Sequence, residues 1–200
     1  MSKKATYKLS TSIINSYLYY LNQKNDYTYI SLVKTIIGAF ETNKWLERGL
    51  AFEEEAFDGK QGKLSEIVKG LEYQVWANRV VEVDGFNLRL SAKVDAIDRD
   101  KKRIFDIKRV DRYDKDKYSE TSTSQHTFYF YLFPEIEEFY YLVAAGPGDI
   151  IEEYKIVQIK RPTQELLEKR LGVYIRQFLG FLKDNNLLDL YTKAQKYIGR

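Results

Sequence analysis

The stretch that decides the fold is IFDIKRV, residues 104–110, in which apolar side chains alternate with Asp106 and Lys108. A period of two is typical of a β-strand, because successive side chains point to opposite faces of the sheet, so Asp106 and Lys108 share one face. The pattern acid-x-Lys is common, and its context must decide whether this copy matters. The other copies in the chain are Asp58-Lys60, Asp100-Lys102 and Glu153-Lys155.

The flanking residues predict a three-strand meander. Residues 74–83 and 86–98 lie on either side of Asp84-Gly85, a strong signal for a two-residue hairpin turn, and residues 99–102 form the turn into strand 103–110. Paired residue numbers in an antiparallel hairpin have a constant sum, so Asp95 should face Asp106 and Lys93 should face Lys108. Two carboxylates ~5 Å apart repel by roughly 3 kcal/mol at an effective dielectric of ~20, and a divalent cation between them would remove that cost.

A plainer interpretation of this strand stays open. Lys93 and Lys108 would then screen the acids diagonally on a face exposed to solvent, which is the usual fate of charged strand residues. The face that carries Val94, Ala96, Phe105 and Ile107 is apolar and is expected in the core.

The rest of the chain predicts helices on both sides of these strands, with no repeat or low-complexity linker. The order predicts an α/β fold with a restriction-endonuclease-like core, in which a mixed sheet of about five strands is flanked by helices. We expect one domain over residues 1–200, with a core at about 40–160 and helical additions at both ends. The predicted helices cover residues 11–22, 29–40, 43–57, 65–69, 125–133, 164–183 and 187–198, and two further strands cover residues 139–145 and 153–160.

A carboxylate interrupts the apolar face of the predicted helix 43–57. Leu46, Leu50 and Phe57 are spaced as one helical face, and Glu53 occupies the position between Leu50 and Phe57. A buried carboxylate costs several kcal/mol unless it is paired, protonated or bound to a metal. Glu53 therefore belongs with Asp95 and Asp106 as a candidate metal ligand.

Composition limits the kind of site that the chain can build. The 200 residues are 44% hydrophobic and 30% charged, which is typical of a globular protein, and no apolar run approaches the ~18 residues of a membrane span. There is no cysteine and one histidine, His126, so a metal would have to be a hard ion held by carboxylates, Mg²⁺ or Mn²⁺. The absence of cysteine also fits a cytoplasmic location.

The predicted helix 125–133 supplies a further polar pair. Gln125 and Tyr129 are four residues apart and therefore lie on one helical face, while Phe128, Phe130 and Phe133 are expected in the core. His126 lies about a quarter turn away and is expected to be structural.

These residues together resemble the RecB-like branch of the PD-(D/E)XK nuclease superfamily, in free-standing versions of the kind that bacteriophages encode. The resemblance rests on an ordered set of motifs between about Ser10 and Tyr141. The set consists of the opening KLSTSIINSYLYY, then Gly49 and Glu53, Asp95, the DIK of residues 106–108, and Gln125 with Tyr129 as Q-x-x-x-Y.

The resemblance implies a Mg²⁺- or Mn²⁺-dependent deoxyribonuclease, an exonuclease or a recombination and repair nuclease. Asp95 and Asp106 would hold the metal with the Ile107 carbonyl and with Glu53. Lys108 would orient the attacking water, and Gln125 and Tyr129 would contact the site or the nucleic acid. Lys93, Arg109 and Arg112 would neutralise DNA phosphates without reading sequence.

Exonuclease versus endonuclease action, DNA versus RNA as substrate, the number of metal ions and the two points that follow stay open at this level. The same fold could serve as a catalytically inactive module that binds nucleic acid or a protein. A ring-shaped homo-oligomer would suit processive digestion of DNA, but no feature of the sequence decides the oligomeric state. No membrane partner is expected.

Overall fold

The structure is a computed structural model, and it describes residues 5–39, 42–120 and 123–197. The strands are β1 (Thr6–Ser10), β2 (Glu72–Val83), β3 (Phe86–Asp98), β4 (Arg103–Val110), β5 (Glu138–Ala145) and β6 (Glu153–Lys160). The helices are α1 (Thr11–Asn22), α2 (Asp26–Ile37), α3 (Lys44–Phe57), α4 (Lys63–Val68), α5 (Gln125–Leu132), α6 (Gln164–Asp184) and α7 (Leu188–Ala194), with a 3-10 turn, η1, at Lys115–Tyr118.

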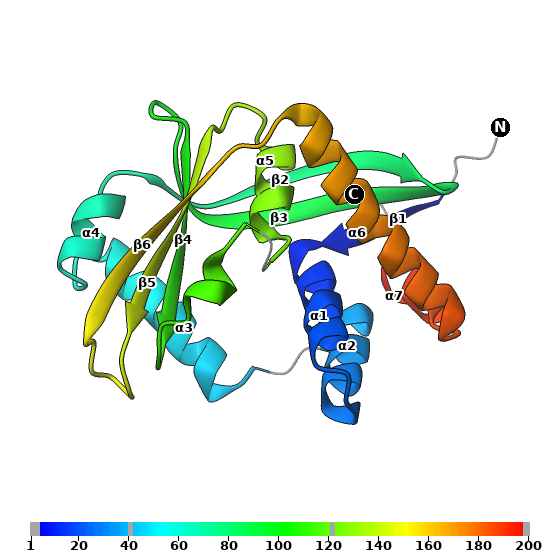
Figure 1. The fold of residues 1–200 in the computed structure, drawn as a ribbon, viewed down its shortest axis with the longest axis horizontal. Helices are drawn as coiled ribbons and strands as arrows, with labels where there is room; N and C mark the ends of the chain where they lie inside the picture. Colours follow the sequence, from blue (N-terminus) through cyan, green and yellow to red (C-terminus); the bar gives the residue numbers. More distant parts are fainter. Residues whose placement is uncertain (1–4, 40–41, 121–122, 198–200) are drawn as a thin grey trace. The chain divides into compact units, whose positions relative to one another are not determined.

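Six strands form one mixed sheet in the order β1-β3-β4-β5-β6, with β2 also paired to β3 (Figure 1). β4 and β5 are parallel, whereas β3–β4 and β5–β6 are antiparallel. The predicted α/β fold with a mixed sheet flanked by helices is confirmed. The strand that the sequence did not predict is β1, which pairs in parallel with residues 87–91 of β3.

Local signals explain most of the element boundaries. Asp84 and Gly85 have φ values of 49° and 82°, as a two-residue hairpin turn between twisted strands requires. The second helix begins at Asp26, three residues before its predicted start, because Asn25 caps it and Thr28 completes a capping box. The last helix ends at Ala194, and the predicted helix ends at residues 40 and 198 lie outside the described residues.

The chain divides into two compact units, Met1–Glu41 with Ala77–Ala92 and Pro162–Arg200, and Thr42–Trp76 with Lys93–Arg161. In the first unit α1 lies beside α2, and Tyr17 of α1 packs edge-on against Phe178 of α6 with ring centroids 5.5 Å apart. The second unit falls almost wholly within the predicted core at residues 40–160. The single-domain assignment stays a prediction.

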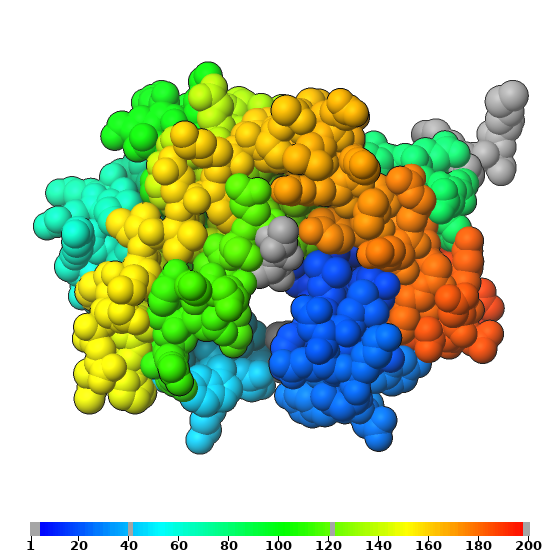
Figure 2. Space-filling view, viewed as in Figure 1, coloured from blue at the N-terminus to red at the C-terminus, as the bar shows by residue number. Residues whose placement is uncertain are grey.

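The second unit is built as layers around β4, β5 and β6. α3 and α4 cover one face through a buried apolar cluster, and α3 crosses behind the strands in Figure 1. Strand β6 lies at the surface of this unit, where its yellow atoms are visible in Figure 2. The buried cluster consists of Phe52, Ala56, Leu64, Val68, Ala96, Phe105, Ile107, Leu142 and Ala144.

Every helix in the described part of the chain is too short or too polar to span a lipid bilayer.

Candidate active site

Asp106, at the centre of β4, is fully buried. The plainer interpretation of the sequence had placed its side chain on a charged face exposed to solvent. Its Oδ2 lies 2.6 Å from Lys108 Nζ, and its Oδ1 accepts a hydrogen bond of 2.5 Å from Gln125 Nε2. Asp95 is only 6% exposed. The interpretation of this strand as a solvated charged face is therefore wrong for both carboxylates.

The predicted register of β3 and β4 is confirmed from Ala96–Phe105 to Asp98–Arg103. The ladder ends there. Next to its end, the Asp95 side chain acts as the acceptor in place of a backbone carbonyl: Asp95 Oδ2 accepts a hydrogen bond of 2.7 Å from the Ile107 N–H. The direct cross-strand pairs Asp95–Asp106 and Lys93–Lys108 were therefore predicted wrongly. The bond instead fixes the Asp95 carboxylate beside β4.

Glu53 reaches this region from α3, but not on the face that the sequence predicted. Leu50 is 43% exposed, and the helix packs on Phe52 and Ala56 instead. Glu53 lies at the edge of that buried face and is partly exposed. Partial burial, reinforced by repulsion from Asp95, raises the pKa of Glu53 to about 7.

Burial and neighbouring charges also shift the pKa values of Asp106, Asp95 and Lys108. Burial raises the pKa of Asp106 to about 7 and raises that of Asp95 as well, although Lys108 lowers both. Burial alone would lower the pKa of Lys108, but attraction from Asp106 and Asp95 outweighs it and holds this pKa well above the usual value. Lys108 is a third exposed and thus keeps access to solvent. Lys108 and Lys93 face three carboxylates here, so the acids outnumber the amines.

Gln125, itself hydrogen-bonded to Tyr129, holds the Asp106 carboxylate in place. Gln125 Nε2 also donates to the Tyr129 hydroxyl at 2.7 Å, and that hydroxyl donates to the Lys93 carbonyl at 3.0 Å. The chain of bonds runs from Asp106 on β4 through α5 to β3, and it fixes the orientation of the Asp106 carboxylate. His126 is buried, and its Nε2 lies 3.0 Å from the Glu120 carbonyl, as expected of a structural histidine.

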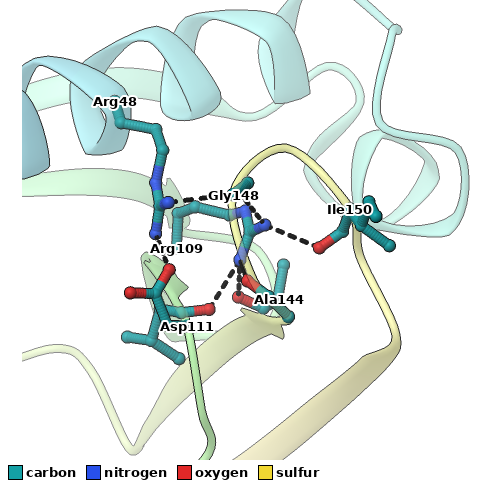
Figure 3. A network of polar contacts seen from close by, with 8 residues as sticks. Arg48, Arg109, Asp111, Ala144, Gly148 and Ile150 are labelled. Carbon is teal, nitrogen blue, oxygen red and sulfur yellow. Dashed lines mark hydrogen bonds and ion pairs between the residues drawn. The ribbon is translucent and has the colours of Figure 1, made fainter.

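Arg109 has a different role from the predicted contact with DNA. Its guanidinium donates to the carbonyls of Val110, Ala144, Gly146, Gly148 and Ile150, so it ties the end of β4 to the β5–β6 loop (Figure 3). A guanidinium that makes five bonds within the protein is not available to a phosphate. Of the other predicted DNA contacts, Arg112 is exposed and Lys93 is partly exposed.

A second arginine, which the sequence analysis missed, extends this network to α3. Arg48 donates to Asp111 Oδ1 at 2.7 Å and to the Gly148 carbonyl at 3.2 Å (Figure 3). It therefore links the helix that carries Glu53 to the loop that Arg109 holds. The signal in the sequence was Trp45-x-x-Arg48, whose spacing places both side chains on one face of α3.

Two other copies of acid-x-Lys form ordinary surface pairs. Lys60 contacts Asp58 and Lys155 contacts Glu153, each at 2.9 Å, and all four side chains are more than 40% exposed. Burial thus distinguishes Asp106-Lys108 from these copies.

The carboxylates fit a hard divalent cation by their chemistry. In the described part of the chain, no three or more His, Cys, Asp and Glu side chains are arranged as a ready coordination sphere. Glu53, Asp95 and Asp106 nevertheless supply oxygen donors only, as Mg²⁺ and Mn²⁺ prefer, and burial raises the pKa of each. A bound cation would favour their ionised forms.

Replacing Glu53 by Gln should stabilise the metal-free protein at alkaline pH. Because the folded pKa is raised, the folded state binds the Glu53 proton more tightly than the unfolded state, and wild-type stability falls as pH rises from about 4.5 to about 7. Above pH 7 the Gln variant should be more stable by roughly 1–2 kcal/mol after allowance for solvent screening, and near pH 4 the difference should vanish. Urea unfolding in EDTA at pH 4, 6 and 8 measures this difference. A variant that is less stable at pH 8 would show that Glu53 is not destabilised by its charge.

Comparison with known proteins identifies the fold. No model of a protein family matches the sequence, and no curated protein is similar to it. A crystal structure of a protein called SSO0001 is similar over 88% of this chain and 76% of its own, with a TM-score of 0.56 and 16% identity. The alkaline exonuclease LHK-Exo from Laribacter hongkongensis is similar over 94% of this chain and 93% of its own, with a TM-score of 0.52 and 13% identity. A structure of LHK-Exo in complex with dAMP has a TM-score of 0.50 at 14% identity, with the same coverage. The chain therefore has the restriction-endonuclease-like α/β fold that is also found in an alkaline exonuclease.

Proposed function

We propose that the chain is a metal-dependent DNA nuclease of the PD-(D/E)XK superfamily, with Asp106 at the centre of its active site. The observation that carries the proposal is the ion pair on β4 between the buried Asp106 and the partly exposed Lys108, in which Gln125 from α5 orients the Asp106 carboxylate. A strand buries a carboxylate at this cost only where something compensates for it. The likeness in fold to an exonuclease supports the same conclusion.

Each residue has a role that follows from its position. Asp95 and Asp106, with Glu53 and the Ile107 carbonyl, would hold Mg²⁺ or Mn²⁺. When bound, such an ion supplies an activated water, a contact to the phosphate and stabilisation of the leaving oxygen. The Lys108 ammonium would hold the attacking water and offset charge on the scissile phosphate. Gln125 and Tyr129 would keep the Asp106 carboxylate in one orientation.

Exonuclease action on DNA is favoured over sequence-specific cutting. Arg112, which is exposed, and Lys93, which is partly exposed, would contact phosphates, and such contacts carry no sequence information. The fold is also that of an alkaline exonuclease. By the resemblance stated above, the chain would belong to the RecB-like branch and act in recombination or repair.

A cleavage assay with matched substrates tests the proposal. Linear duplex, closed circular plasmid and single-stranded DNA are each incubated with the protein in Mg²⁺, Mn²⁺, Ca²⁺ or EDTA. The proposal predicts acid-soluble nucleotides from linear DNA in Mg²⁺ or Mn²⁺, none in EDTA, and an intact plasmid. Cleavage that persists in EDTA would contradict the metal dependence, and nicking of the plasmid would contradict exonuclease action. DNA binding without cleavage in any metal would favour the inactive binding module on the same fold.

A further inference from the structure

Trp45, near the start of α3, is a large apolar side chain that is exposed to solvent. It is 64% exposed, although burial of an indole ring is worth several times as much as that of a small side chain. Aromatic rings left at the surface often mark binding sites, where one large rigid side chain provides much contact area at a low entropic cost. The exposed Trp45 ring is therefore a candidate contact for a ligand.

One face of the Trp45 ring is supported by a cation that is itself held in place. The Arg48 guanidinium carbon lies 4.8 Å from the Trp45 ring centroid, within the range of a cation–π interaction. Arg48 is fixed in turn by Asp111 and by the Gly148 carbonyl, and Arg109 fixes the loop that contains Gly148 (Figure 3). The ring is thus preorganised, which lowers the cost of ordering it on binding.

Trp45 lies at a defined distance from the proposed chemistry. It precedes Glu53 by eight residues on the same helix, an axial separation of about 12 Å. That distance corresponds to roughly three nucleotides of a stacked strand, at about 3.4 Å each. Lys44 and Arg112 are exposed and next in sequence to Trp45 and to Asp111, respectively. Their charge is complementary to a phosphate backbone that passes the ring.

We propose that Trp45, supported by Arg48, stacks on an unpaired nucleobase of the DNA strand that is cleaved. The inference rests on the proposed nuclease function, from which it takes the position of the scissile phosphate. A base in a duplex has both faces covered by its neighbours, whereas a base in a single strand can offer a face to an aromatic ring, whatever its identity. The substrate would accordingly include a single-stranded segment about three nucleotides from the scissile bond.

The chain offers a matched pair of variants, because it contains two tryptophans and both are exposed, Trp76 to 68%. The Trp76→Phe variant retains Trp45 as its single tryptophan. The Trp45→Phe variant retains Trp76 instead. Each is titrated with single-stranded oligothymidylate in EDTA, so that no cleavage occurs, while binding is followed independently by the anisotropy of a labelled oligonucleotide. We expect saturable quenching of tryptophan fluorescence in Trp76→Phe protein and little in Trp45→Phe protein.

Affinity provides the second readout. Trp45→Ala should weaken binding of the single strand roughly fivefold to a hundredfold, the loss of one base–aromatic stack, and change binding of a blunt duplex less than about twofold. Arg48→Met should give a smaller loss of the same kind. Unchanged Trp45 fluorescence while the oligonucleotide binds, or equal affinities of Trp45→Ala and wild type, would overturn the inference.

The proposed nuclease activity and the proposed stacking site can be contradicted separately, because each has its own measurement. Cleavage of DNA in Mg²⁺ by a protein whose Trp45 fluorescence does not respond to the single strand would overturn the stacking site and leave the nuclease. Quenching of Trp45 in a protein that cleaves no DNA in Mg²⁺ or Mn²⁺ would overturn the nuclease and leave a single-strand binding site.

Discussion

Lys108→Met should lower the rate of DNA cleavage in Mg²⁺ by roughly 10²- to 10⁴-fold, the range for loss of a group that acts on the transition state. Lys108 is ion-paired to Asp106 at 2.6 Å, and attraction from the acids keeps it protonated at any working pH. It is also a third exposed and can therefore contact substrate. Single-turnover cleavage at saturating enzyme measures the rate, and DNA affinity in EDTA should change much less.

The control is Lys60, the lysine of another acid-x-Lys copy in the chain, Asp58-Lys60. Lys60 pairs with Asp58 at 2.9 Å and is 64% exposed, so Lys60→Met should leave the rate within about twofold. Circular dichroism establishes that both variants are folded. Equal losses in the two variants, or wild-type cleavage by Lys108→Met, would show that the motif on β4 has no special role.

Gly146→Ala should cause the largest loss of stability, roughly 3–5 kcal/mol in the free energy of unfolding. Gly146 has a φ of 151°, and a Cβ there would lie 2.3 Å from the Ile150 carbonyl oxygen and 2.8 Å from the Glu152 nitrogen. Arg109 binds the carbonyls of both Gly146 and Ile150, so the loop cannot move aside without breaking those bonds. Urea unfolding of the full chain measures the loss.

Gly148→Ala is the matched control, two residues further along the same loop. Gly148 has a φ of 55°, but nothing lies within 4 Å of the position of a Cβ. Only the left-handed backbone is then unfavourable, which costs about 1 kcal/mol. A similar loss in both variants would mean that backbone conformation alone, and not the close approach to Ile150, makes Gly146 necessary.

The parts of the site that could be predicted from sequence are those that depend on short-range periodicity. A period of two places Asp106 and Lys108 on one face of β4, and a period of 3.6 places Gln125 and Tyr129 together on α5. Turn residues fixed the register of β3 and β4. Each of these follows from residues close together in the chain.

The parts that could not be predicted depend on residues far apart in the chain. Asp95 leaves the ladder because its side chain takes the Ile107 N–H, a choice between partners that hydrophobic periodicity does not encode. Arg109 was assigned to DNA because of its positive charge close to the proposed site. Most of the carbonyls that its guanidinium binds belong to residues 144–150, which are far from it in the chain. β1 has five residues, too few for a clear alternation, and is defined by partners far away in the chain, β3 and Lys196.

The central claim is that Glu53, Asp95 and Asp106 hold a divalent cation, and Mn²⁺ binding tests it most directly. Mn²⁺ is titrated into the protein at pH 8, and binding is followed by calorimetry and by the electron paramagnetic resonance signal of free Mn²⁺. The proteins compared are wild type, Asp106→Asn, Glu53→Gln and Lys60→Met. We predict saturable binding by wild type and Lys60→Met, with affinity lower by about tenfold or more in the two carboxylate variants. Absence of binding to wild type, or equal binding by all four proteins, would contradict the claim.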